Sequence, residues 1–268
     1  MRGQITNTNV VTTCSLEGWQ KYGQRMVETF TQFWPREILL TVYVENFSVP
    51  VAPNVRAADF PQWFVDWKKR HLYDKGAHGL DVRFNRRGRP YDFRRDCVKF
   101  AHKVAAFTDH ALRLDRGLLI WMDADMLTHD RVTEEWLESY LRPAPDGPYM
   151  GWLDRSRLYP ECGFLLFNCA HPRHHEFMNS LLDIYRSDRV FELSETHDSF
   201  VIEKVARAAV KVGWFPEPVS LSGTARGYHH PLPHSELGSR LDHAKGARKS
   251  HGRTPSHEVN RREAHWSV

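Results

Sequence analysis

The stretch "GLLIWMDAD", residues 117–125, joins a short apolar run to two carboxylates. Such a run, bounded by polar residues, is typical of a buried strand in an α/β sheet. In open sheets of this class, ligands bind outside the carboxyl ends of the strands, where Asp123 and Asp125 are expected. Because side chains alternate along a strand, both carboxylates should point to the same side, where a divalent cation can neutralise them. A turn or helix cap would also explain an acidic pair here.

Strands and helices are predicted to alternate around this stretch. Residues 9–15 and 38–46 have the β-branched composition of strands, and residues 16–34 between them carry apolar side chains at helical spacing. This order predicts a mixed, mostly parallel central sheet flanked by helices. Further helices are expected at 60–73, 92–114, 131–141, 172–186 and 197–212, and further strands at 149–153 and 162–168.

Length and composition predict a folded protein with one main domain. The chain has 268 residues, of which 41% are hydrophobic and 26% charged. We expect the domain to cover residues 1–218, with an irregular, proline-rich insertion at about 47–93 and a basic C-terminal segment at 219–268. There is no apolar run of membrane-spanning length and no apolar signal core at the N-terminus, so we expect a cytoplasmic protein.

Positive charge is concentrated in the C-terminal residues. The formal net charge is +4, and basic residues outnumber acidic ones after residue 244. Such a tail attracts polyanions, including nucleotide phosphates and nucleic acids, or simply solvates the surface. Charge alone leaves both interpretations open.

A second group of candidate ligands occurs in "HAKGARK", residues 243–249. His243 offers an imidazole suited to Mn²⁺-class ions, Gly246 lets backbone approach a diphosphate, and Lys249 neutralises its charge. Taken alone, His243 is equally explained as a surface histidine in a basic tail. Together with the acidic pair it predicts a site for a metal ion and a diphosphate.

The strand-helix-strand opening, the mid-chain Asp-x-Asp and the late His-x-x-Gly-x-x-Lys resemble the metal-dependent GT-A glycosyltransferases. The chain looks most like the retaining branch that includes glycogenin and bacterial lipopolysaccharide galactosyltransferases. The resemblance implies a GT-A (Rossmann-like) catalytic domain over 1–218, completed at its metal and diphosphate site by 219–268. It also implies transfer of a hexosyl or pentosyl group from a nucleotide-diphosphate sugar, with a UDP-sugar as first candidate and Mn²⁺ or Mg²⁺ as cofactor.

The resemblance also implies roles for individual residues. Asp123, Asp125 and His243 would ligate the metal, and Asp123 would also contact the donor ribose. Gly246 and Lys249 would hold the departing diphosphate. The other positions implied to bind the donor are Thr12, Thr13 and Cys14 beside the nucleobase, and Lys103, with Lys99 as a second candidate, on the helix before the acidic pair.

Two carboxylates are expected near the transferred sugar. Asp198, in "THDSF", matches the position beside the sugar, and Glu161, in "ECGFLLFN", replaces an asparagine of the family pattern. Ser250-His251 replaces the family's Pro-Trp. Either carboxylate could act as a general base in an inverting reaction, whereas a retaining enzyme needs none, so the stereochemistry stays open.

Two acceptors are compatible with the sequence. Arginines at 86, 87, 89, 94 and 95, the basic tail, and the aromatic residues Trp63, Phe64 and Trp67 could bind DNA and stack on an exposed base. That acceptor would be a hydroxymethylated pyrimidine, as for a viral-type enzyme in a phage-infected bacterium. Alternatively the aromatic residues fill a core, and the acceptor is a glycan such as lipopolysaccharide or capsule.

Two other classes of protein share part of this sequence pattern. A haloacid dehalogenase-type phosphatase also has Asp-x-Asp after a strand, but that pattern requires Thr or Val where this chain has Leu127. A non-catalytic nucleic-acid-binding protein would explain the basic tail but not the joint presence of Asp123, Asp125 and His243.

Overall fold

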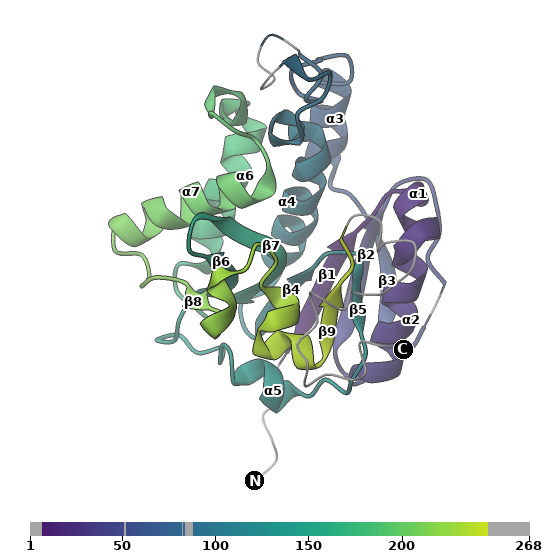
Figure 1. Ribbon diagram of the computed structural model, residues 1–268, viewed down its shortest axis with the longest axis vertical. Helices are drawn as coiled ribbons and strands as arrows, with labels where there is room; N and C mark the ends of the chain where they lie inside the picture. The colour runs from purple at the N-terminus through teal and green to yellow at the C-terminus, as the bar shows by residue number, and fades with distance from the viewer. Residues whose placement is uncertain (1–6, 51, 82, 84–87, 246–268) are drawn as a thin grey trace. The chain divides into compact units, whose positions relative to one another are not determined.

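The computed structural model describes residues 7–50, 52–81, 83 and 88–245, which form two compact units. The first unit comprises the chain up to Asp59, Leu114–Pro172, and the chain from Pro218. The second comprises Phe60–Arg113 and Arg173–Glu217. Figure 1 labels the helices and strands of both units.

The first unit is built on a seven-stranded sheet with the order β3-β2-β1-β4-β7-β6-β8. Every neighbouring pair is parallel except the two that β7 makes with β4 and β6. The mostly parallel α/β sheet predicted from the sequence is therefore confirmed. The strands of this sheet are β1 (Asn9–Thr13), β2 (Leu39–Val44), β3 (Val55–Asp59), β4 (Leu118–Met122), β6 (Met150–Arg155), β7 (Leu158–Asn168) and β8 (Val219–Ser220).

Helical residues between β1 and β2 cover part of this sheet. They run without a break through α1 (Leu16–Gly18), a π-helical turn (Trp19–Gly23) and α2 (Gln24–Phe33). The α2 side chains Met26 and Phe30 join the apolar core formed by the sheet. A short helix, α5 (Glu134–Glu138), occupies part of the range predicted as a helix at 131–141.

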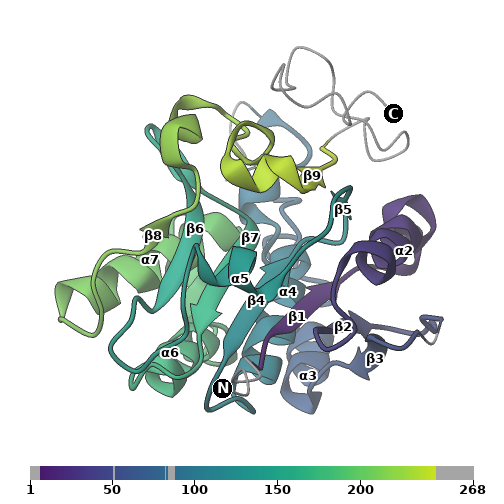
Figure 2. The same ribbon diagram turned by 90° about the horizontal axis from the view of Figure 1, so that it is seen from below.

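Two very short strands form a separate ribbon in the first unit. β5 (Met126–Thr128) follows β4 after a turn, and β9 (Leu241–His243) pairs with it in antiparallel fashion. Figure 2 shows the two strands side by side. The ribbon concerns the predicted metal site because β9 ends at His243.

The second unit is helical. Its long elements are α3 (Gln62–Arg70), α4 (Cys97–Ala111), α6 (His174–Arg186) and α7 (Asp198–Lys211). Phe64 and Trp67 are buried, with Trp67 donating its indole N–H to Asp188 at 2.7 Å. Trp63 is partly covered by the Arg186 guanidinium, which lies 5.2 Å from its ring. These aromatic residues form a core, so the prediction that Phe64 and Trp67 stack on an exposed base is wrong.

The insertion expected at about 47–93 contains the helix predicted at 60–73, observed as α3, and also β3, a strand that the pattern does not predict and that pairs with β2. Most of its residues are at least partly exposed, so no apolar pattern marks the strand. The other strands that the pattern does not predict, β5, β8 and β9, have at most three residues each. No helix within the described part of the chain is long and apolar enough to cross a membrane.

Candidate functional site

The acidic pair lies in the turn that joins β4 to β5. β4 ends at Met122, so Asp123 and Asp125 follow the carboxyl end of the strand, as predicted, but neither belongs to a strand. The Asp123 backbone N–H donates to the carbonyl of Gly163 at 2.8 Å, and its carboxylate accepts from the Trp121 indole N–H at 2.7 Å. The indole bond holds the carboxylate oxygen Oδ1, and the other oxygen, Oδ2, faces His243.

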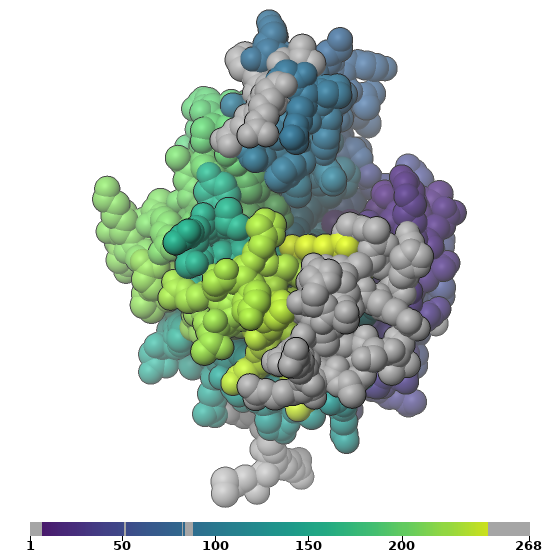
Figure 3. Space-filling view, in the orientation of Figure 1, coloured from purple at the N-terminus to yellow at the C-terminus, as the bar shows by residue number. Residues whose placement is uncertain are grey.

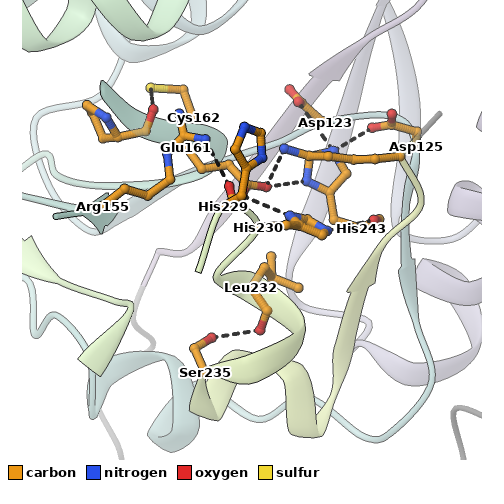
Figure 4. Close-up of polar contacts among 12 residues, drawn as sticks. Asp123, Asp125, Arg155, Glu161, Cys162, His229, His230, Leu232, Ser235 and His243 are labelled. Atoms are coloured by element: carbon orange, nitrogen blue, oxygen red, sulfur yellow. Dashed lines mark hydrogen bonds and ion pairs between the residues drawn. The ribbon is translucent and has the colours of Figure 1, made fainter. Parts of the chain in front are cut away.

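Pairing between β5 and β9 brings His243 to the acidic pair. Met126 is opposite His243 in this ladder, and the Ala244 N–H donates to the Asp125 carbonyl at 3.0 Å. Residues directly opposite in an antiparallel pair lie side by side, so this register fixes the imidazole next to the turn. His243 Nε2 is 3.0 Å from Asp125 Oδ1 and 3.7 Å from Asp123 Oδ2 (Figure 4).

The three side chains have the geometry of a metal-ligand set. One ligand atom from each of Asp123, Asp125 and His243 lies within 4.8 Å of the other two. Adjacent ligands of an octahedral cation at about 2.1 Å are separated by about 3.0 Å, which matches the 3.0 Å between His243 Nε2 and Asp125 Oδ1, while Asp123 Oδ2 lies 3.7 Å from Nε2. Two carboxylates and an imidazole are suitable donors for Mn²⁺ or Mg²⁺. The residues therefore fit the predicted cation.

β7 provides the space in which His243 lies. The pairing register between β6 and β7 shifts after Trp152, so that Trp152 is opposite Leu165 while Leu153 is opposite Glu161. This irregularity contains Gly163, whose missing side chain is essential, because a Cβ there would lie 2.5 Å from His243 Cε1. Bulges of this kind are common beside functional sites.

Glu161 binds the other nitrogen of His243. Its Oε1 accepts from His243 Nδ1 at 2.7 Å and from the Lys245 ammonium at 3.0 Å. Its Oε2 lies 2.8 Å from Nδ1 of His230, and Nε2 of His230 lies 3.1 Å from the His243 carbonyl. Only 3% of the Glu161 side chain is exposed, so the carboxylate is enclosed by its partners.

The electrostatic field of the cluster favours a positive charge at the acidic pair. Burial alone would lower the pKa of His243, but the Asp125 charge and hydrogen bonds to Asp125 and Glu161 raise this pKa to about 9. Burial would raise the pKa of Glu161, but the Lys245 ammonium and hydrogen bonds from His230 and His243 hold it well below its usual value. The carboxylates of Asp125 and Glu161 thus stabilise a positive charge on the His243 imidazole.

The residues predicted to border a nucleobase lie at the carboxyl end of β1. The Thr13 hydroxyl donates to the Tyr43 carbonyl at 2.7 Å, while Thr12 is buried and its hydroxyl has no hydrogen-bond partner among the described residues. Burial raises the pKa of Cys14 to about 12. Burial, together with the Asp125 charge, likewise raises the pKa of Tyr22 to about 12. The contact of Thr12, Thr13 and Cys14 with a nucleobase stays a prediction.

Lys103 and Asp198 form a buried ion pair within the second unit. Burial would raise the pKa of Asp198, but the Lys103 charge and a hydrogen bond from His197 hold it below its usual value. Asp198 is in the first turn of α7, where the helix dipole also favours a negative charge. Lys99 is exposed on α4. Their roles toward a donor or a sugar stay predictions.

Some predicted residues lie outside the described part of the chain. Gly246, Lys249, Ser250 and His251 belong to this group, as do the rest of the basic tail from 246 to 268 and the arginines at 86 and 87. The diphosphate contacts predicted for Gly246 and Lys249 therefore stay predictions.

The sequence did not identify His230 or Lys245 as parts of this site, whereas Gly163 belongs to "ECGFLLFN", the stretch that resembles the family's pocket strand. His230 lies in the histidine-rich stretch "GYHHPLPH", residues 227–234, which is a signal that could have drawn attention to it. Figure 3 shows that the segment around this stretch, coloured yellow-green, forms part of the molecular surface. Lys245 has no comparable local signal, because its role depends on neighbours distant in sequence.

No protein-family model and no curated protein matches the chain. Among solved structures, the chain is similar to mouse xyloside xylosyltransferase 1 in its apo form, with a TM-score of 0.46 and 9% identity over 80% of this chain and 86% of that one. It is also similar to the apo-form glycosyltransferase GlyE of Streptococcus pneumoniae TIGR4, with a TM-score of 0.42 and 10% identity over 79% of this chain. The similarity to GlyE spans 44% of that protein's chain.

Proposed function

We propose that this protein is a metal-dependent glycosyltransferase that moves a sugar from a nucleotide-diphosphate donor, such as a UDP-sugar, to a hydroxyl group. The observation that supports this most directly is the meeting of Asp123, Asp125 and His243, because residues 118 positions apart combine into one set of cation ligands. A structural role alone gives little reason to gather two carboxylates and an imidazole at the carboxyl end of a central strand. The resemblance of the sequence to GT-A enzymes points to the same chemistry.

The chemistry requires stabilisation of a leaving diphosphate. A bound divalent cation would stabilise the negative charge that develops there, a kind of contact whose removal commonly costs about 3 to 4 kcal/mol of barrier. In this protein, Trp121 orients the Asp123 carboxylate, and the β5–β9 pairing orients His243. The ligands are therefore arranged before a donor binds, which lowers the entropic cost of forming the reactive complex.

The acceptor is proposed to be a glycan. The alternative, a hydroxymethylated pyrimidine in DNA, depends on exposed aromatic residues for stacking, and Phe64 and Trp67 are buried. Salt-sensitive binding of the full chain to duplex DNA would instead favour the DNA acceptor. Absence of such binding, with sugar transfer to an oligosaccharide, would support the glycan.

The proposed function is tested by calorimetric titration of UDP into the full chain with and without Mn²⁺, followed by assay of UDP release from UDP-sugars. We expect UDP binding to depend on Mn²⁺, and Asp125→Asn and His243→Ala to abolish this dependence. The matched control is Asp146→Asn, at an exposed position of the first unit, which should bind as the unaltered protein does. UDP binding that is equally strong without Mn²⁺, or that survives both site substitutions, would contradict the proposal.

A further inference from the structure

We propose that Glu161 is a positioning residue that holds His243 with Nε2 directed toward a divalent cation, and that His230 and Lys245 hold Glu161 in turn. This inference rests on the proposed metal site and assigns a second layer of residues to it. It also gives Glu161 a role different from the general base predicted from the sequence.

The two nitrogens of His243 have different partners. Nε2 faces the acidic pair, at 3.0 Å from Asp125 Oδ1, and Nδ1 faces Glu161 Oε1 at 2.7 Å. A metal ligand must offer a lone pair, so Nε2 is free to bind a cation only when Nδ1 carries the ring hydrogen. A carboxylate accepts that hydrogen, and Glu161 therefore selects the tautomer needed at Nε2.

Glu161 is itself fixed from two further directions. Lys245 donates to the oxygen that binds His243, at 3.0 Å, and His230 contacts the second oxygen at 2.8 Å. The Nε2 atom of His230 lies 3.1 Å from the His243 carbonyl, which ties the backbone of β9 to the same network. Figure 4 shows dashed lines from the Glu161 carboxylate to both His230 and His243. A buried carboxylate with this many partners has little freedom to rotate.

Strand geometry explains why Glu161 and Gly163 act together. Alternate residues of a strand point to the same face, so positions 161 and 163 of β7 are neighbours on one side. Gly163 leaves room for the imidazole, and Glu161 binds its Nδ1. The strand thus supplies both the space for His243 and the group that sets its orientation.

A direct catalytic role for Glu161 conflicts with its surroundings. A general base must come within about 3 Å of the acceptor hydroxyl, directly or through one water. Both carboxylate oxygens of Glu161 already have partners, and its side chain is 3% exposed. An acceptor could reach it only by displacing His230, His243 or Lys245.

The experiment measures Mn²⁺ binding by calorimetry and nitrogen coupling to bound Mn²⁺ by pulsed electron paramagnetic resonance, without any donor. The variants are Glu161→Ala, Glu161→Gln and His230→Ala, with Glu37→Gln as an exposed control in the same unit.

Glu161→Ala should weaken Mn²⁺ affinity about 10- to 100-fold and reduce the imidazole coupling. Glu161→Gln, whose side-chain carbonyl can still accept from Nδ1–H, should restore the coupling and part of the affinity. His230→Ala should give a smaller loss than Glu161→Ala.

Three results would overturn the inference. The first is unchanged Mn²⁺ affinity and imidazole coupling in folded Glu161→Ala and His230→Ala, with turnover lost only on substitution of Glu161, because that pattern belongs to a general base. The second is weakened affinity with unchanged coupling in every Glu161 variant, which indicates a general loss of stability. The third is a lack of Mn²⁺ binding by the unaltered protein, which would remove the proposed metal site as well and so differs from the first two.

Discussion

Replacing Gly163 with alanine provides a direct test of how His243 is held. The new Cβ would lie 2.5 Å from Cε1 and 2.7 Å from Nδ1 of His243, whereas ordinary contacts begin at 3.4 Å. The imidazole cannot swing away freely, because its nitrogens bind Glu161 at 2.7 Å and Asp125 at 3.0 Å. To reach an ordinary contact the ring must move by about 0.9 Å, which would break at least one of these bonds.

The expected cost combines overpacking with a lost buried hydrogen bond. Each of these effects is worth about 1 to 3 kcal/mol, and partial relaxation of the ring should leave a total of about 2 to 4 kcal/mol. Urea denaturation of the metal-free protein at neutral pH measures this change in the free energy of unfolding. Gly227→Ala is the matched control, because a Cβ there meets no atom within 4 Å and should change stability by less than about 0.5 kcal/mol.

A double-mutant cycle identifies the cause of the loss. After the two His243 ring atoms, the next-nearest atom to the new Cβ is Asp123 Oδ2 at 3.4 Å, so a His243→Ala background leaves only an ordinary contact. Gly163→Ala should then cost less than about 0.5 kcal/mol, so the coupling between the two positions should approach the full cost of the single substitution. An equal cost of Gly163→Ala in both backgrounds would refute the reasoning.

Three further predictions concern other buried groups. Lys103→Met should lower the free energy of unfolding, measured by urea denaturation, by about 3 to 5 kcal/mol, because it leaves Asp198 buried without its cation. The double variant Lys103→Met/Asp198→Leu removes the buried charge as well and should recover most of this loss. Because the folded-state pKa of Asp198 lies below its usual value of 3.8, the stability it contributes is present above that pH and is lost as the pH falls below it. The difference in unfolding free energy between the unaltered protein and Asp198→Asn should therefore shrink below pH 3.8, and a constant difference would contradict this. Burial raises the pKa of Cys14 and Cys169 to about 12, so little of the reactive thiolate is present at pH 8. Iodoacetamide should therefore label these thiols far more slowly in the native than in the urea-unfolded protein, as measured by mass spectrometry.

The sequence by itself determined the class of fold and the position of the acidic pair. The apolar runs that became β1, β2 and β4 are strong and local, and the helical spacing after β1 is equally clear. The turn residues Asp123 and Asp125 follow directly from where β4 ends. His243 could be named as a third ligand because its surrounding motif is visible without knowledge of the fold.

Only the tertiary structure decided how these residues meet. β5 and β9 have three residues each, too few for a periodic pattern, and their pairing joins segments more than a hundred residues apart. The register of β7 and this pairing together create the space beside Gly163. They also bring Glu161 into contact with His230 and Lys245. Burial of Phe64 and Trp67 likewise came from packing within the second unit. The physical reason is that local periodicity sets the type of each element, whereas contacts between distant elements depend on packing that no single segment encodes.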